Sequence, residues 1–199
     1  MIKPLLASVF LASSLFAADG PLLKDDFSNP KLESRRASRG EWRFADHTAT
    51  CTQDDELYKK FKDHGPIIFY DLAYENATLR FSYKADAAVK ALVFTANGTE
   101  GHVFRFLTSP KGTGIRAFPA DDKDHKSISL GNESPTLTPG EWIPVVVTLK
   151  GSQATVKIGD FEKTYEHPSL ARPKSNLSIG FSFGTVSVKD VVVESLAKE

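Results

Sequence analysis

Alternating apolar and polar positions are the dominant pattern of this chain. The segment NATLRFSYK at 76–84 shows it most clearly, because Ala77, Leu79, Phe81 and Tyr83 are each separated by one polar residue. Successive side chains of a strand point to opposite faces, so these four residues would line one face and the polar residues the other. The pattern therefore predicts a strand with one buried face and one face in contact with water.

Similar segments, rich in β-branched and aromatic residues, continue from residue 41 to the end of the chain. Turn-forming residues separate them, including Asn97-Gly98 and Pro139-Gly140, and Asn-Gly is a strong signal for a tight hairpin turn. The predicted strands are 41–45, 47–53, 66–72, 76–84, 89–96, 102–109, 114–120, 126–131, 141–150, 153–159, 161–167, 176–183 and 185–197. Many short strands joined by short turns are typical of an all-β protein.

Two features interrupt the strand pattern. The segment 55–61 has apolar residues at helical spacing and predicts one short helical turn. In the last predicted strand the alternation changes phase near Lys189-Asp190, which predicts a β-bulge. With these exceptions the chain fits an all-β fold, a concanavalin A-like jelly-roll sandwich of two curved antiparallel sheets.

The beginning of the chain has the layout of a secretory signal peptide. Lys3 provides a positive charge, an apolar run at 5–16 follows, and the small residue Ala17 closes it. The apolar run is shorter than the roughly 20 residues that cross a bilayer. We therefore predict a signal peptide over 1–17, one domain over 18–199, a secreted or periplasmic location and no membrane span.

The composition excludes several classes of function. Lys and Arg total 25 and Asp and Glu total 25, so no net positive charge attracts the chain to nucleic acid. The single cysteine, Cys51, excludes an internal disulfide framework and a cysteine-based zinc site. Because the surrounding HTATCTQ alternates, we interpret Cys51 as a small buried strand residue, with a catalytic or intermolecular thiol as the alternative.

Several segments, taken in their order and spacing, resemble a known family. They are KDDFSNPKL at 24–32, DHGPI at 63–67, GHVFRFLTSPKG at 101–112, DDKDHK at 121–126, LTPGEW at 137–142 and SFGTVSVKDVVVE at 182–194. This set resembles the exported bacterial 3-keto-disaccharide hydrolase-type domains (DUF1080), which are also described as glycoside-hydrolase-family-16-like. The resemblance implies a concanavalin A-like (laminin G-like) sandwich and carbohydrate as the partner.

The chain departs from the active family 16 glucanases at one point. Those enzymes carry the strand motif E-x-D-x-x-E, which supplies three carboxylates, two of them spaced for a retaining mechanism. The sequence contains no such triplet. A laminarinase-type reaction is therefore not expected, and the likeness to this family describes a fold rather than a chemistry.

His102 and Arg105 are candidate ligand-binding residues on the predicted strand 102–109. Their separation is odd, so regular alternation would place them on opposite faces, with His102 beside Phe104 and Phe106. A histidine beside aromatic rings can hydrogen-bond a sugar hydroxyl, and the alternative is a core histidine satisfied by the backbone. A guanidinium among apolar neighbours needs a carboxylate or a ligand, so Arg105 is either a structural ion-pair residue or a binding residue.

The loop at 121–125 is the densest polar cluster of the chain. Asp122 and Asp124 could hold calcium, which takes oxygen ligands, and no other cofactor is evident. Together with His125 they could instead bind a sugar, or form a solvated loop. Asp124 and His125 are also candidate catalytic residues, as general bases. His64, in a predicted turn before the strand at 66–72, completes the candidate ligand-binding set unless it serves the turn alone.

Three functions are compatible with the sequence. The favoured one is an exported carbohydrate-binding domain that recognises an oligosaccharide on a concave sheet. The alternatives are a sugar-active enzyme of the 3-keto-glycoside hydrolase or lyase type and a cell-envelope protein-interaction domain. Convergence of the candidate residues in one groove would favour the first two, whereas scatter over convex loops would favour the third. The pattern predicts no particular oligomeric state.

The calcium hypothesis for Asp122 and Asp124 predicts that EDTA lowers the melting temperature of the protein. An ion that binds only the folded state stabilises it, so removing the ion must destabilise the fold. Thermal denaturation with and without EDTA, and after adding back excess calcium, measures this effect. A melting temperature that EDTA does not change contradicts the hypothesis.

Overall fold

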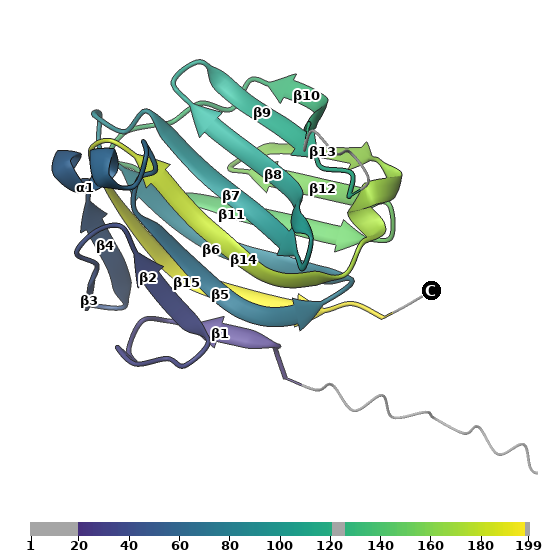
Figure 1. The fold of residues 1–199 in the computed structure, drawn as a ribbon, viewed down its shortest axis with the longest axis horizontal. Coiled ribbons are helices and arrows are strands. Elements are labelled where there is room, and N and C mark those ends of the chain that lie inside the picture. Colours follow the sequence, from purple (N-terminus) through teal and green to yellow (C-terminus); the bar gives the residue numbers. More distant parts are fainter. Residues whose placement is uncertain (1–19, 121–125, 198–199) are drawn as a thin grey trace, which may run out of the picture.

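The computed structural model describes residues 20–120 and 126–197, and within them the chain forms two facing antiparallel sheets (Figure 1). The strands of sheet A are β1 Leu23–Asp25, β3 Arg43–Ala45, β4 Thr48–Thr52, β6 Ala77–Ala85, β11 Ile143–Lys150, β12 Gln153–Ile158, β13 Phe161–Glu166 and β15 Thr185–Ser195. Their spatial order is β13-β12-β11-β6-β15-β4-β3, and β1 also pairs with β15. The predicted signal peptide, 1–17, lies outside the described residues.

Sheet B covers one side of sheet A. Its strands are β2 Arg35–Ser38, β5 Ile67–Tyr74, β7 Ala91–Gly98, β8 Gly101–Ser109, β9 Gly112–Ala117, β10 Ile128–Glu133 and β14 Lys174–Ser182. Their spatial order is β10-β9-β8-β7-β14-β5-β2. Two curved antiparallel sheets packed in this way confirm the predicted jelly-roll sandwich. None of the helices in the described part of the chain is long and apolar enough to cross a membrane.

The facing sides of the two sheets form the core. Ala77, Leu79, Phe81 and Tyr83 on β6 are all buried, as the alternation predicts. Phe81 stacks on Phe94 of β7 with ring centroids 6.0 Å apart, so the contact joins sheet A to sheet B. Burying a side chain of this size stabilises the fold by about 1.5–3 kcal/mol.

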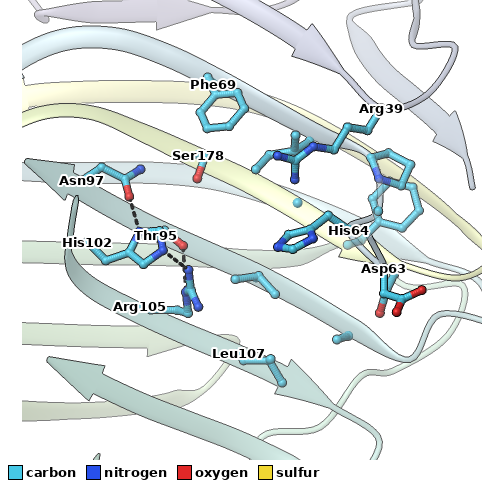
Figure 2. Close-up of a pocket in the computed structure, with 18 of the residues that line it drawn as sticks. Arg39, Asp63, His64, Phe69, Thr95, Asn97, His102, Arg105, Leu107 and Ser178 are labelled. Carbon is cyan, nitrogen blue, oxygen red and sulfur yellow. Dashed lines mark hydrogen bonds between the residues drawn. The ribbon is translucent and has the colours of Figure 1, made fainter. Parts of the chain in front are cut away.

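The opposite side of sheet B faces away from the core. On β7, Leu92, Phe94 and Ala96 are buried against sheet A, and Val93 and Thr95 alternate with them on the outward side. This outward side is hollowed near its middle (Figure 2). The residues that alternate with the core residues along each strand are therefore the ones whose side chains face the hollow.

Both predicted interruptions of the strand pattern are confirmed. Helix α1, Asp55–Lys60, begins where the carboxylate of Asp54 accepts a hydrogen bond from the backbone N–H of Leu57. In β15 the register shifts between Lys189 and Val192, and Asp190 adopts a φ of 56°. The bulge divides one edge of β15 into two parts, and β4 pairs with the first and β1 with the second.

Two predictions about local structure differ from the structure, and a third is confirmed. Strand β7 continues through Asn97 and Gly98, and Thr99 and Glu100 form the turn, so the predicted turn was two residues early. Strands β1 and β2 precede residue 41, where no strand was predicted. The prediction for Cys51 was right: it is buried on β4, and burial raises the pKa of its thiol to about 11.

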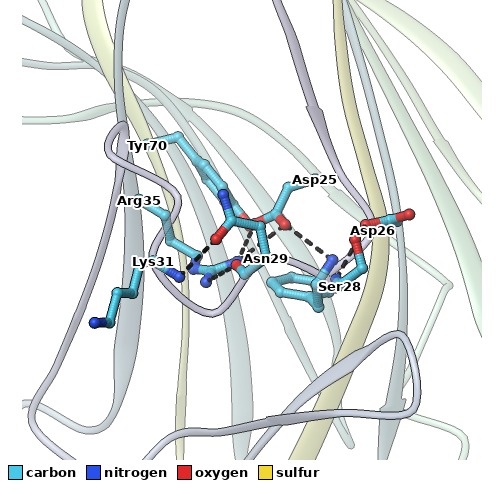
Figure 3. Close-up of polar contacts among 8 residues, drawn as sticks. Asp25, Asp26, Ser28, Asn29, Lys31, Arg35 and Tyr70 are labelled. Atoms are coloured by element: carbon cyan, nitrogen blue, oxygen red, sulfur yellow. Dashed lines mark hydrogen bonds and ion pairs between the residues drawn. The ribbon is translucent and has the colours of Figure 1, made fainter.

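A buried ion pair between β1 and β2 joins sheet A to sheet B (Figure 3). Arg35 of β2 donates through Nη1 to the carboxylate of Asp25 of β1 at 2.7 Å, and both side chains are 2% exposed. The hydroxyl of Tyr70 of β5 donates to the same carboxylate at 2.9 Å. The backbone N–H of Phe27 donates to its other oxygen. Asp25 therefore accepts hydrogen bonds from several donors, as a buried carboxylate requires.

Aromatic rings complete the surroundings of Arg35. Its guanidinium carbon lies 4.0 Å from the ring centroid of Phe44 and 5.3 Å from that of Phe27. Its Nη2 donates to the backbone oxygen of Asn29 at 2.7 Å. Burial and the neighbouring Asp25 raise the pKa of Tyr70 well above its usual value, so its hydroxyl keeps the proton that it donates. The guanidinium is thus enclosed by partners that replace the hydrogen bonds to water that it loses on burial.

We expect Asp25→Ala to lower the free energy of unfolding by about 3–5 kcal/mol, because it leaves the charge of Arg35 buried without a partner. Tyr70→Phe removes one hydrogen bond to a charged group and costs about 1.5–3 kcal/mol. Asp71→Ala is the matched control, because Asp71 of β5 forms an exposed ion pair with Arg36, the neighbour of Arg35 on β2. Loss of an exposed pair costs about 1 kcal/mol or less. Urea denaturation measures all three, and equal losses for Asp25→Ala and Asp71→Ala would contradict the prediction.

Candidate functional site

The hollow on sheet B is a cavity of about 470 Å³, called the sheet B cavity below. Strands β5, β14, β7 and β8 form its floor with their outward side chains, and the loop between α1 and β5 forms one wall. Phe69, Val93 and Leu107 provide apolar surface. Gly180 lies between Ile67 and Val93 in the strand register and adds no side chain, which leaves the floor low at that point.

A chain of hydrogen-bonded polar side chains runs along one side of the cavity (Figure 2). Asn97 donates through Nδ2 to Oδ1 of Asn176 at 2.8 Å. Its Oδ1 lies 2.6 Å from Nδ1 of His102. Nε2 of His102 lies 2.7 Å from Nη2 of Arg105. Arg105 also donates through Nε to the hydroxyl of Thr95 at 3.2 Å. These contacts hold each polar group in one orientation.

The prediction that His102 and Arg105 lie on opposite faces was wrong. The register between β7 and β8 skips a residue, because Ala96 pairs with Phe104 whereas Asn97 pairs with His102. A β-bulge at this point changes the phase of the alternation, so His102 turns to the same side as Arg105. Phe104 instead faces the core, where it is fully buried. The sequence pattern alone does not contain this bulge.

His102 is held as the neutral tautomer that carries its proton on Nδ1. A guanidinium can only donate, so Nε2 must accept from Arg105 and Nδ1 must donate to Asn97. Partial burial, with the nearby charge of Arg105, lowers the pKa of His102 to about 4. The ring of Phe118 packs edge-on against the imidazole with centroids 5.2 Å apart. His102 is therefore a fixed neutral group that orients its two neighbours.

Arg105 is half-buried among partners that carry no negative charge. Besides Thr95 and His102, its guanidinium lies over the ring of Phe118, 5.3 Å from the centroid. Arg116 lies directly opposite Arg105 on β9. Burial first, and then the charge of Arg116, lower the pKa of Arg105 from its usual value. No carboxylate forms an ion pair with Arg105 within residues 20–120 and 126–197.

His64 reaches the same cavity from the opposite wall. Its Nδ1 lies 2.8 Å from the backbone oxygen of Lys62 and 3.1 Å from that of Phe61, so Nδ1 carries the proton. Lys62 and Asp63 have left-handed backbone, with φ of 55° and 61°. Figure 2 shows the ring of His64 pointing into the cavity, where Nε2 is left as an acceptor.

The structure brings together three of the candidate ligand-binding residues, His64, His102 and Arg105, which all line the sheet B cavity. The other candidates, Asp122, Asp124 and His125, lie outside the described residues. These three residues include both calcium candidates, Asp122 and Asp124, and both catalytic candidates, Asp124 and His125. Elsewhere in the chain, within the part that the structure describes, no group of three His, Cys, Asp or Glu side chains could hold a metal ion.

Sequence reasoning missed the polar residues that complete the site. Asn97 was predicted to lie in a turn, and neither Asn176 nor Thr95, which are single polar residues in apolar strands, was predicted to bind a ligand. Arg39, on the wall near His64, lies in a region where no element was predicted. The useful signal was an asparagine inside an otherwise apolar strand, since such a residue needs a hydrogen-bond partner.

Comparisons with known proteins identify the fold. No protein-family model and no curated protein matches the chain. A similar solved structure is the carbohydrate-binding module CBM66 from Bacillus subtilis, with a TM-score of 0.60 and 9% identity over 81% of this chain and 96% of that one. Another is the CBM2 module of the evolved Dit protein of Lactobacillus casei BL23 phage J-1, with a TM-score of 0.62 and 13% identity over 87% and 94%.

A third similar structure is a Parabacteroides distasonis protein provisionally assigned as a glycosyl hydrolase. Its TM-score is 0.55 and its identity 14%, over 88% of this chain and 98% of that one. At these identities the likeness shows the fold alone. The chain therefore shares its jelly-roll sandwich with carbohydrate-binding modules and with glycosyl hydrolase-like proteins.

We expect the stability of the protein to fall as the pH drops from about 6.5 to about 4, with His102 as one cause. The unfolded chain takes up a proton at the ordinary histidine pKa of 6.5, whereas folded His102 does so only near pH 4. Between these values the unfolded state binds more protons, so the folded state loses stability as the pH falls. Urea denaturation at about pH 7 and about pH 4.5 measures the loss.

His102→Gln removes this titration and keeps a polar side chain at the site. The variant should therefore lose less stability than the wild type between the two pH values. The same pH dependence in both proteins would show that His102 is not held neutral by its surroundings.

Proposed function

We propose that the chain is an exported carbohydrate-binding domain that recognises an oligosaccharide in the sheet B cavity. The observation that carries the proposal is the hydrogen-bonded chain Asn176–Asn97–His102–Arg105 beside the apolar surface of Phe69. Sugars present hydroxyl groups together with apolar C–H faces. A site with fixed polar groups next to an aromatic or aliphatic surface matches both features.

The preformed geometry of the site favours binding. Each polar side chain of the chain is already held by its neighbour, so little side-chain entropy remains to be lost when a ligand arrives. The cavity volume of about 470 Å³ falls in the range of roughly 300–1,000 Å³ that is usual for small-ligand sites. The convergence of His64, His102 and Arg105 in one hollow also favours a sugar ligand over a protein-interaction surface.

Two further considerations support the proposal. Two of the similar solved structures are named as carbohydrate-binding modules. The resemblance to 3-keto-disaccharide hydrolase-type domains agrees with the same ligand class and extends the proposal to 3-keto sugars. The proposal of export rests on the signal-peptide pattern of residues 1–17.

A sugar-active enzyme is the second candidate, and the geometry of His64 favours it. With its Nδ1 proton held by two backbone oxygens, His64 presents the Nε2 lone pair to the cavity. An imidazole in that state can accept a proton from a bound sugar. Mass spectrometry of each bound oligosaccharide after incubation separates the two candidates, because a binding domain returns the sugar unchanged and an enzyme does not.

The proposed function predicts that Arg105→Ala weakens binding of the recognised oligosaccharide by about tenfold or more. The change removes a charged hydrogen-bond donor, which contributes about 1.5–3 kcal/mol, and it also releases His102. Isothermal titration calorimetry with ligands first found in a thermal-shift screen of an oligosaccharide panel, 3-keto sugars included, measures the affinity. Arg80→Ala is the control, because Arg80 pairs with Glu194 on the outward face of sheet A. Unchanged affinity in Arg105→Ala would place the binding site elsewhere.

A further inference from the structure

The arginines of this protein fall into two groups. Arg35, Arg36 and Arg80 each form an ion pair with a carboxylate, even where they are exposed. Among the described residues Arg39, Arg43, Arg105 and Arg116 form no ion pair with a carboxylate, and of these Arg105 and Arg116 lie side by side on neighbouring strands. The partners of Arg105 and Arg116 among the described residues are hydroxyl groups, an imidazole and an aromatic ring, none of which balances a positive charge.

These two arginines extend a row of residues that crosses sheet B. The strand register places Phe69, Ser178, Thr95, Arg105 and Arg116 opposite one another on five successive strands. The row begins with apolar and neutral side chains at the cavity floor and ends with two adjacent guanidinium groups. Arg105 therefore brings positive charge to one end of the cavity, where its partial burial weakens the screening by water, and the exposed Arg116 lies beside it outside the lining.

The rest of the cavity does not balance this charge. Arg39 adds a second guanidinium to the lining, and Figure 2 shows it directed toward the cavity from the wall opposite Arg105. Asp63 is the one acidic residue that lines the cavity among the residues described. In Figure 2 its carboxylate points away from Arg105, on the far side of His64. As far as the residues 20–120 and 126–197 line it, the sheet B cavity is therefore positive.

Arg105 also has the hydrogen-bonding capacity for an anion. A guanidinium has five N–H groups. One on Nε donates to Thr95 and one on Nη2 donates to His102, which leaves three that donate to no described residue. Because His102 and Thr95 fix the plane of the guanidinium, the remaining donors on Nη1 and Nη2 keep the fork geometry that binds an oxyanion through two bonds.

We infer that the oligosaccharide recognised in the sheet B cavity is acidic and that Arg105 binds its negatively charged group. The group is a carboxylate, as in a uronic acid, or a sulfate ester, since both present oxygen pairs to a guanidinium. This inference rests on the proposed function and specifies its ligand class. Asn97 and His102 position Arg105, and the apolar floor at Phe69 contacts the sugar rings.

The test compares acidic oligosaccharides with their neutral counterparts on the wild-type protein. Tetrasaccharides of galacturonate, of mannuronate and of guluronate are titrated beside their methyl esters, which keep the sugar and remove the charge. A sulfated tetrasaccharide and its desulfated form make a second arm, which distinguishes the carboxylate from the sulfate. We expect at least one acid to bind about tenfold or more tightly than its neutral counterpart, and raised salt to weaken that binding.

Arg105→Gln links the preference to one side chain. Glutamine keeps an amide donor for His102 and removes the charge, so the acid and its neutral counterpart should then bind with similar affinity. Arg80→Gln, on sheet A, is the matched control and should keep the preference. Circular dichroism and the melting temperature of both variants show that they are folded.

The outcomes separate this inference from the proposed function. If every acid binds no better than its neutral form, or if neutral oligosaccharides bind and the acids do not, the inference is wrong and carbohydrate binding stands. If no oligosaccharide of any kind binds, the proposed function fails as well. An acid preference that Arg105→Gln leaves unchanged would also overturn the inference, because the charge would then be recognised elsewhere.

Discussion

The buried ion pair between Asp25 and Arg35 is the constraint on which the arrangement of the sheets depends. It connects β1 of sheet A with β2 of sheet B, and Tyr70 brings β5 into the same contact. Because neighbouring residues of a strand face opposite ways, fixing Tyr70 toward the core also fixes Phe69 toward the cavity. The buried contact between Tyr70 and Asp25, which stabilises the fold, thus also sets which side chains of β5 face the floor of the site.

The site itself depends on two departures from regular strand structure. The bulge in β8 turns His102 toward Arg105, and the left-handed backbone before His64 turns that ring into the cavity. Gly65 allows the second departure, because a Cβ there would lie 2.0 Å from the backbone oxygen of Phe181. Irregular backbone of this kind costs free energy, and it persists where surrounding contacts hold it in place. Here the contacts that hold it also orient the polar groups of the cavity.

The sequence predicted the sandwich well, because burying one strand face requires a period of two, and that period is visible in single segments such as 76–84. It did not predict β1 and β2, since a buried Asp25 and a buried Arg35 look like exposed residues until their pairing is known. For the site, the residue types in the sequence indicated candidate binding residues, but the sequence did not predict how these residues are arranged. Arg105 was singled out because a charge among apolar neighbours needs a partner, but the bulge beside it depends on pairing between strands, which no local pattern contains.

Arg35 and Arg105 differ in how their positive charge is compensated. Arg35 is enclosed with a carboxylate, hydrogen-bond acceptors and aromatic rings, so its charge is compensated within the chain. Arg105 has an equally well-defined orientation, but its partners are neutral and it stands beside Arg116. Orientation without charge compensation contributes little to folding, and no carboxylate in the described part of the chain balances the charge of Arg105. It does prepare the guanidinium for an anion from outside, since the ligand would supply the missing charge without any rearrangement of the site.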